Sequence, residues 1–415
     1  MPLSKYTFPG LYMEEVSTGA RPIQAVNMST AAFVGQAPDA GAHLNQATPI
    51  NNWSQFVKEF VPLDGGTSTP LSPAVAGFFF NGGSRCYIIN MPAGDSIAGM
   101  EKPRRTGLKL LQEIDEVSII AAPGCTDAGS HDALISFAEG SNNCMAICDP
   151  PLEVPDTDLL KIVATAPASK KPDRSNDAPG AGPANPSPPT GLRPRVSAKG
   201  CGTFYFPCII VADALSPKGE LVAVHPSGHM AGIWARTDAE LGCHKAPAGV
   251  GLSPRGVFNL TYRVTNEEQG GLNSAGVNVI RFFSREGHTV WGARTLAEEA
   301  SEWRYVNVRR LVNMIKESIL RSTKWVVFEP NTLTTWKSIR FQIEQFLRLV
   351  WRDGALMGAS PEEAFFVKCD AETNPPEVVD AGQLVILIGV APVKPAEFVI
   401  FRIGQHAGGG TAETV

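Results

Sequence analysis

The stretch from Leu272 to Ile403 decides the fold of this chain. It contains, in order, the segments LNSAGVNVIRFF (272–283), VWGARTL (290–296), EWRYVNVRRLVNMIKESI (302–319), KWVVFEPN (324–331), AFFVKCD (364–370) and GVAPVKPAEFVIFRI (389–403). Within it, the apolar runs WVVFE (325–329) and LVILIG (384–389) predict strands that alternate with helices. Strands that alternate with helices indicate an α/β fold.

The strongest helix is expected in TTWKSIRFQIEQFLRLVWRDG (334–354). Its apolar residues recur at steps of three and four, so they form one stripe facing the core. The stripe consists of Trp336, Ile339, Ile343, Phe346, Val350 and Trp351. The opposite face carries Lys337, Arg340, Glu344, Arg348 and Arg352. Gly354 lies just past the expected end of the helix.

Residues 31–257 predict a second α/β layer. CYIIN (86–90), VSIIAA (117–122) and CMAICD (144–149) are continuous apolar runs, as in strands buried on both faces. Helices are expected between them, around residues 107–114 and 131–139. Earlier in the layer, Asn52 is expected to cap one helix, and Ser72-Pro73 to start another.

Residues 165–195 interrupt this layer with eight prolines and no aromatic residue. Such a composition buries too little apolar area to offset its ordering entropy, so we predict an exposed insertion loop. An interdomain linker is the alternative. At the ends of the chain we expect an extended arm over residues 1–30, with a disordered terminus as its alternative, and a flexible tail over residues 404–415.

Composition excludes several classes of function. The 415 residues carry a net charge of -5, and no basic cluster is interleaved with aromatics, so no nucleic-acid partner is expected. The longest apolar run, Leu384 to Val393, is half of the roughly 20 residues that span a bilayer. No membrane insertion is therefore expected. MPLSKYTFPG lacks the apolar region of a secretory signal, which predicts assembly in the bacterial cytoplasm.

No motif for catalysis or for a cofactor is found. The eight cysteines do not match zinc spacings, and we predict buried free thiols. His225 and His229 lie four apart, but Pro226 makes His225 a helix cap, so no metal is predicted. The pair Cys144 and Cys148 near Asp149 is the only enzyme candidate, and we predict that the chain is not an enzyme.

With the opening PGLYMEEVSTGARPI (9–23), the ordered motifs resemble the contractile tail sheath proteins of phages and phage-like injection systems. The resemblance covers roughly residues 8–150 and 200–403. It implies hexameric rings that stack helically around an inner tube and contract from a metastable extended state. It also implies a peripheral α/β domain at residues 31–257 and an inner, tube-facing domain at residues 258–403, joined by the N-terminal arm.

In this family, arms from neighbouring subunits exchange strands, and a C-terminal-domain helix holds the tube. The matching strand arms here are Leu11, Tyr12, Met13, Glu14, Glu15 and Val16 at one end, and Glu397, Phe398, Val399, Ile400, Phe401, Arg402 and Ile403 at the other. A buried core strand is the alternative for the second arm. The candidate tube contacts are Lys337, Arg340, Arg348 and Arg352.

The resemblance implies four kinds of partner: copies of the chain, an inner tube protein, baseplate proteins and a terminator or cap. The short peripheral domain is similar to that of phage-like extracellular particles, with a phage tail sheath as the alternative. Two alternatives come from other classes. One is a binding module built on the proline-rich insertion, and the other is an enzyme with an unrecognised site.

Overall fold

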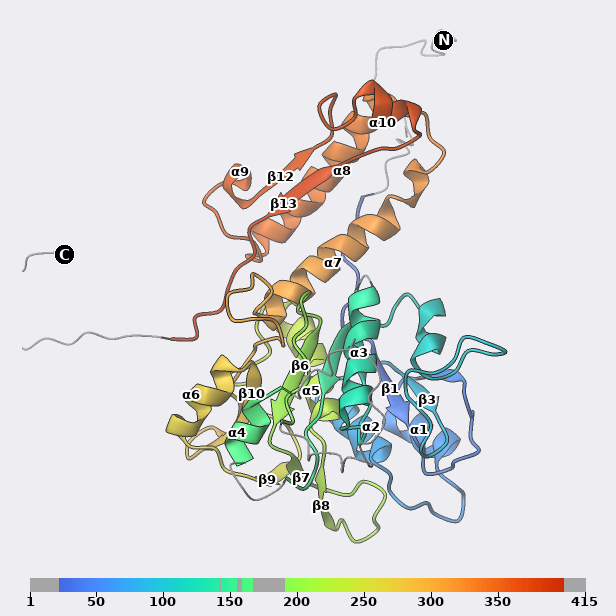
Figure 1. Ribbon diagram of the computed structural model, residues 1–415, viewed down its shortest axis with the longest axis vertical. Coiled ribbons are helices and arrows are strands. Elements are labelled where there is room, and N and C mark those ends of the chain that lie inside the picture. Colours follow the sequence, from blue (N-terminus) through green and yellow to red (C-terminus); the bar gives the residue numbers. More distant parts are fainter. Residues whose placement is uncertain (1–21, 142, 155–158, 167–190, 399–415) are drawn as a thin grey trace, which may run out of the picture. The chain divides into compact units, whose positions relative to one another are not determined.

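The computed structural model describes residues 22–141, 143–154, 159–166 and 191–398, which fall into two units by their contacts (Figure 1). Of the described residues, the larger unit contains those within Val26–Glu317, Gly354–Met357 and 392–398. The smaller unit contains residues 22–25, Ser318–Asp353 and Gly358–Ala391. Each unit is described by itself below.

An eight-stranded sheet forms the centre of the larger unit, in the order β11-β10-β6-β5-β4-β1-β3-β2. All neighbours are parallel except the pairs at the two ends, β10–β11 and β2–β3. The strands are β1 (Ala31–Gly35), β2 (Ala47–Ile50), β3 (Cys86–Asn90), β4 (Ile119–Ala121), β5 (Met145–Cys148), β6 (Gly202–Phe206), β10 (Val277–Phe283) and β11 (Gly287–Val290). The three predicted apolar runs are β3, β4 and β5, so this prediction is confirmed.

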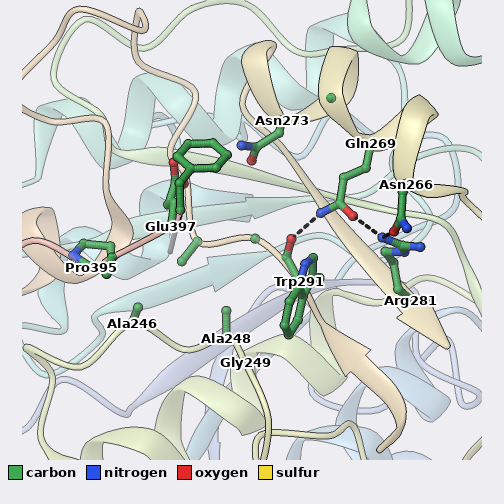
Figure 2. A pocket seen from close by; sticks show the side chains of 15 residues that line it. Ala246, Ala248, Gly249, Asn266, Gln269, Asn273, Arg281, Trp291, Pro395 and Glu397 are labelled. Atoms are coloured by element: carbon green, nitrogen blue, oxygen red, sulfur yellow. Dashed lines mark hydrogen bonds between the residues drawn. The ribbon is translucent and has the colours of Figure 1, made fainter. Parts of the chain in front are cut away.

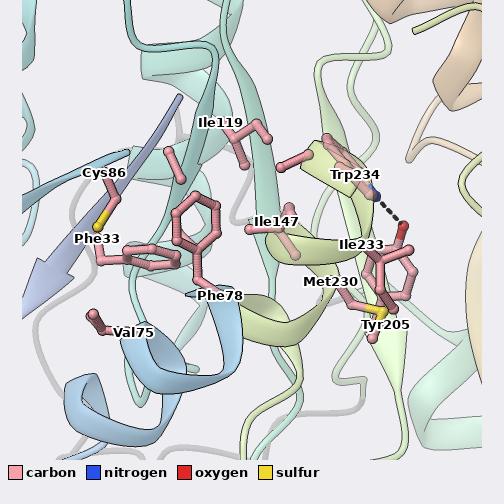
Figure 3. Packing of buried hydrophobic residues seen from close by; sticks show 14 of the residues in the cluster. Phe33, Val75, Phe78, Cys86, Ile119, Ile147, Tyr205, Met230, Ile233 and Trp234 are labelled. Carbon is pink, nitrogen blue, oxygen red and sulfur yellow. Dashed lines mark hydrogen bonds between the residues drawn. The ribbon is translucent and has the colours of Figure 1, made fainter. Parts of the chain in front are cut away.

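Helices cover both faces of this sheet, because alternate residues of each strand point to opposite sides. Ala31 and Phe33 of β1 pack in one cluster with α1 (Trp53–Phe60), α2 (Leu71–Phe80) and α5 (Ser227–Leu241) (Figure 3). Ala32 and Val34 pack in another cluster. The elements of that second face are η1 (Gly107–Glu113), α3 (Ala128–Gly140), α4 (Leu159–Ala164) and α6 (Asn266–Ser274). The expected α/β class is confirmed.

A second, antiparallel sheet in the larger unit has the order β8-β7-β9. Its strands are β7 (Ile209–Ala212), β8 (Leu221–Val224) and β9 (Val257–Leu260). We expected the peripheral domain to end at residue 257, whereas the contacts divide the chain after Glu317. The difference arises because β10 and β11 belong to the large sheet. The division into inner and peripheral domains of an assembled subunit stays a prediction.

The smaller unit is built on α8 (Leu333–Arg352), which confirms the strongest predicted helix. A two-stranded antiparallel sheet of β12 (Phe365–Lys368) and β13 (Leu387–Val390) accompanies it, and β12 contacts α8. The short elements are η2 (Lys324–Val326), α9 (Pro361–Ala364) and α10 (Pro376–Asp380). Helix α7 (Val306–Ser322) begins in the larger unit, and its last residues are counted with the smaller one.

Two local predictions are wrong and one is confirmed. WVVFE (325–329) is no strand: it holds the end of η2 and a turn, and no strand pairs with it. Helix α2 begins at Leu71, with Pro70 as its N-cap, so Ser72 lies within the first turn instead of capping it. The side chain of Asn52 does cap α1, since it accepts a hydrogen bond from the Gln55 N–H.

Candidate assembly surfaces

The two predicted strand arms lie mostly outside the described residues. Leu11 to Val16 and Val399 to Ile403 are not described, so their role stays a prediction. Glu397 and Phe398 are described, and neither is in a strand. The role of these two residues in strand exchange between subunits therefore stays a prediction as well.

Arg294 holds Glu397 through two hydrogen bonds. Its Nε and Nη2 donate to the two carboxylate oxygens, at 2.9 and 2.6 Å. Arg294 is only 4% exposed, and its Nη1 also donates to the Asn273 carbonyl at 3.0 Å. Fork-shaped Arg–carboxylate pairs of this kind are among the strongest polar contacts in proteins. The pair fixes the segment before Phe398 to the larger unit.

A cavity of about 420 Å³ lies beside this segment (Figure 2). Pro395 and Glu397 line one side of it, and α6 lines the other. On the α6 side, Arg281 Nη1 donates to the side-chain oxygens of Asn266 at 2.7 Å and Gln269 at 2.8 Å. Among the described residues no carboxylate pairs with Arg281; its guanidinium contacts these two amide oxygens and lies over the ring of Phe283, 5.1 Å from the ring centroid.

A second buried arginine holds the first described residues of the chain. Arg310 donates from Nη2 to the carbonyl of Met28 at 2.8 Å, and it forms a fork-shaped ion pair with Asp238 of α5. Its guanidinium also stacks over Trp234, with 4.9 Å between the carbon Cζ and the ring centroid. Residue Arg310 therefore ties the N-terminal segment to α5 and α7 within the larger unit.

Sequence reasoning missed both arginines, although each lies in a quoted motif. Arg294 is in VWGARTL and Arg310 in EWRYVNVRRLVNMIKESI. The signal that could have found them is a charged residue among apolar neighbours. Such a residue is buried only where a partner compensates its charge, so it points to an unseen partner. The partners Glu397 and Asp238 lie 103 and 72 residues away in the chain, so no local pattern identifies them.

The four predicted tube-contact residues share the outer face of α8. Lys337, Arg348 and Arg352 are exposed, and Arg340 is half-buried. Of the four, only Arg340 forms an ion pair within the described residues, with Glu344 at 3.4 Å. At 100° per residue, exposed Phe341 lies on the same face, between the directions of Arg348 and Arg352. The face is therefore basic with one exposed aromatic side chain, which sequence reasoning missed.

The β12–β13 sheet has an open, partly apolar face. Phe366 and Leu387 are 58% and 50% exposed, and the pairing register places them on the same side. Phe366 lies across Gly389, where even a methyl group would clash with its ring. Within the described residues neither edge of this sheet pairs with another strand.

The candidate enzyme residues are buried among structural contacts. Burial raises the pKa of the Cys144 thiol to about 12 and that of the Asp149 carboxyl to about 7. Asp149 accepts a hydrogen bond from the Ser227 N–H at 2.9 Å, at the start of α5. The pKa of His131 is lowered by burial to about 4, and its ring nitrogen bonds the Asp149 carbonyl. Thiols held protonated in this way are poor nucleophiles.

The remaining predicted groups have structural positions. All eight cysteines are unpaired, and six of them are buried. His225 and His229 are buried as well, but the N-cap of α5 is Pro226, so the predicted cap at His225 is wrong. The described residues contain no group of three or more His, Cys, Asp or Glu side chains that could hold a metal ion. No described helix has the length and apolarity needed to cross a membrane.

Comparison with known proteins gives a consistent result along the chain. Residues 298–405 match the model of the phage tail sheath C-terminal domain family. The tail sheath protein of Vibrio phage KVP40 is 30% identical over 174 residues, which are 42% of this chain. That match spans only 25% of the phage protein's own length.

Two solved structures match almost the whole chain. One is the sheath complex of an extracellular contractile injection system, PVC, in its contracted state, with a TM-score of 0.73. The other is the helical sheath of the anti-feeding prophage in its contracted state, with a TM-score of 0.71. Both are 28% identical, and each match covers 97% of this chain and at least 99% of the matched chain. The chain is therefore similar, along almost its whole length, to the sheath subunits of contractile injection systems.

Proposed function

We propose that this chain is the structural subunit of a contractile sheath that drives an inner tube through a target envelope. The observation that supports this most is the match of 97% of the chain to two sheath subunits. The chain then works without catalysis, as a mechanical part. Its hexameric rings stack helically around the tube, because a contact between different surfaces of identical subunits extends into open filaments.

Strand exchange links the subunits. The β12–β13 sheet has only two strands in the described residues, so both of its edges are free to accept another strand. Leu11 to Val16 and Glu397 to Ile403 of neighbouring subunits supply these strands by pairing along the free edges. Backbone hydrogen bonds then keep the lattice connected while the subunits move.

The outer face of α8 contacts the inner tube. Lys337, Arg348 and Arg352 form no ion pair within the described residues, so they can pair with acidic groups on the tube. Phe341 lies between them and supplies an apolar anchor. Arginine and aromatic residues together are typical of interface centres.

Contraction is a rigid-body rearrangement of folded subunits. The free energy comes from an extended lattice that relaxes to a better-packed one, and no nucleotide is consumed. The baseplate supplies the trigger at one end of the sheath, and a terminator protein closes the other end. Assembly takes place in the bacterial cytoplasm, and the product is a phage tail-like particle.

An extracellular phage-like particle is favoured over the tail of an infecting phage. The structural relatives named for an extracellular injection system and an anti-feeding prophage match 97% of the chain. The phage relative matches 42% of the chain and is much longer. Because those two matches cover nearly all of both chains, we assign this chain to the former class.

Electron microscopy tests the proposed function. The chain is produced alone and together with its tube protein, and striated cylinders around tubes are expected. Charge reversal of Lys337, Arg340, Arg348 and Arg352 to Glu should abolish assembly on tubes while the monomer stays folded. The matched control reverses Lys58, Arg104, Arg105 and Lys218 of the larger unit, and normal assembly is expected. Dispersed wild-type monomers with and without tube would refute the sheath function.

A further inference from the structure

The turn between α7 and α8 exposes an unusual amount of apolar surface. Phe328 is 101% exposed and Val327 is 64% exposed, and Trp325 beside them is 36% exposed. Large aromatic side chains that are fully exposed contribute nothing to the core of the unit that carries them. Their apolar area is available for a contact outside the subunit.

The backbone at Phe328 is strained as well. Its φ is +74°, in the left-handed region that residues other than glycine rarely adopt. The other described non-glycine residues with positive φ are His43 and Asn45. Asparagine and histidine are enriched in this conformation, whereas a bulky aromatic residue is an outlier there. Backbone strain of this kind clusters at functional sites.

Local hydrogen bonds hold the turn in this conformation. The N–H of Val327 donates to the Lys324 carbonyl at 3.3 Å, and that of Glu329 donates to the Val326 carbonyl at 3.1 Å. α8 begins four residues further on, at Leu333. The ring of Phe328 is therefore presented on a constrained turn, at a cost in monomer stability that no contact of the ring offsets.

We infer that the turn Trp325–Phe328 is a contact surface for a second copy of this chain. This inference rests on the proposed assembly into a sheath. The turn is uncharged from Trp325 to Phe328, unlike the basic outer face of α8, so it suits an apolar surface better than an acidic tube. The same chain offers such a surface, because Phe366 and Leu387 are exposed on the open face of β12–β13.

Replacing Phe328 by glycine distinguishes a role of this side chain in the contact between subunits from a role in the stability of the monomer. Glycine adopts positive φ without strain, so the monomer's melting temperature should rise. Sheath assembly should nevertheless fall at least tenfold, because the ring is gone. The matched control is Leu63→Gly, which removes an equally exposed apolar side chain from the larger unit and should leave assembly unchanged. If the Phe328→Gly variant assembles as well as the wild-type chain, the inference is wrong.

Photo-cross-linking identifies the partner. A benzophenone amino acid replaces Phe328, and the chain is assembled with its tube protein and irradiated. The expected product has the mass of two copies of this chain. A cross-linked product that contains the tube protein would overturn the inference. So would the absence of any cross-linked product when sheaths have assembled. If wild-type chains fail to assemble at all, the proposed function fails instead, so the two failures are distinguishable.

Discussion

The two units of this chain use their apolar side chains in different ways. In the larger unit, Phe33, Phe78 and Trp234 are buried between a sheet and its helices (Figure 3). In the smaller unit, many large apolar side chains remain exposed. They are Leu320, Trp325, Val327, Phe328, Leu333, Phe341, Leu349, Phe366, Val385, Leu387 and Ile388. The smaller unit therefore exposes many large apolar side chains beside its own buried ones, such as Ile343 and Phe346, as expected if the proposed assembly covers them.

The sharpest test of this contrast removes one aromatic ring from each unit. Phe33 is fully buried, and its ring centroid lies 5.5 Å from that of Phe78. Phe33→Ala should lower the free energy of unfolding by about 3–5 kcal/mol, because a cavity is left in the core. Phe366→Ala should lower it by less than about 1 kcal/mol. Urea denaturation measures both, and equal losses would refute the contrast.

An ion pair in the larger unit should contribute more to the free energy of unfolding than one in the smaller unit. Arg310 is buried and the Asp238 side chain is only 10% exposed, so Arg310→Ala leaves an uncompensated carboxylate and should cost about 3–5 kcal/mol of unfolding free energy. Arg340 and Glu344 are partly exposed neighbours on α8, and Arg340→Ala should cost about 0.5 kcal/mol or less. Thermal unfolding of both variants checks this. A cost above about 2 kcal/mol for Arg340→Ala would show that the smaller unit has a polar core.

The buried carboxyl of Asp149 should make the larger unit sensitive to pH. Burial raises its folded-state pKa to about 7, well above the ordinary value of an aspartate. Stability from this group is complete below the unfolded pKa and is lost as pH rises through 7. Between pH 5 and 8 the unfolding free energy should fall by roughly 2–3 kcal/mol.

The variant Asp149→Asn isolates this effect. Asparagine keeps an oxygen for the Ser227 N–H and does not ionise, so the pH dependence should disappear. Denaturation curves at pH 5 and 8 measure the difference between variant and wild type. An equal change between pH 5 and 8 in variant and wild type would mean that Asp149 is ionised throughout this range.

The smallest expected effect is at the C-terminal segment. Glu397→Gln should weaken the contact to Arg294 by about 1–2 kcal/mol, because a charge-assisted fork becomes a neutral hydrogen bond. Hydrogen exchange at residues 392–398 should then be faster while global stability changes little. Glu299→Gln is the control, since Glu299 is exposed and lies 3.6 Å from the same guanidinium. Unchanged exchange in Glu397→Gln would show that the segment is held by its other contacts.

Periodicity predicted much of the fold. The buried stripe of α8 is confirmed for Trp336, Ile339, Ile343, Phe346 and Val350, and Trp351 is half-buried. Such repeats report which side of an element faces the core, and the spacing alone contains that information. The strand predicted at WVVFE is wrong because a strand needs a neighbouring strand to pair with. The composition of a segment does not say whether such a neighbour is available.

Local sequence patterns predicted the α/β class, the long helix α8 and the buried strands of the large sheet, and the ordered motifs indicated the resemblance to contractile tail sheath proteins. Local spacing encodes these features. Only the tertiary structure decided that Arg294 holds Glu397, that Arg310 holds Met28, and that Phe328 is exposed on a strained turn. These features depend on which distant residues meet in the folded chain and which side chains find no partner, and no local pattern records either.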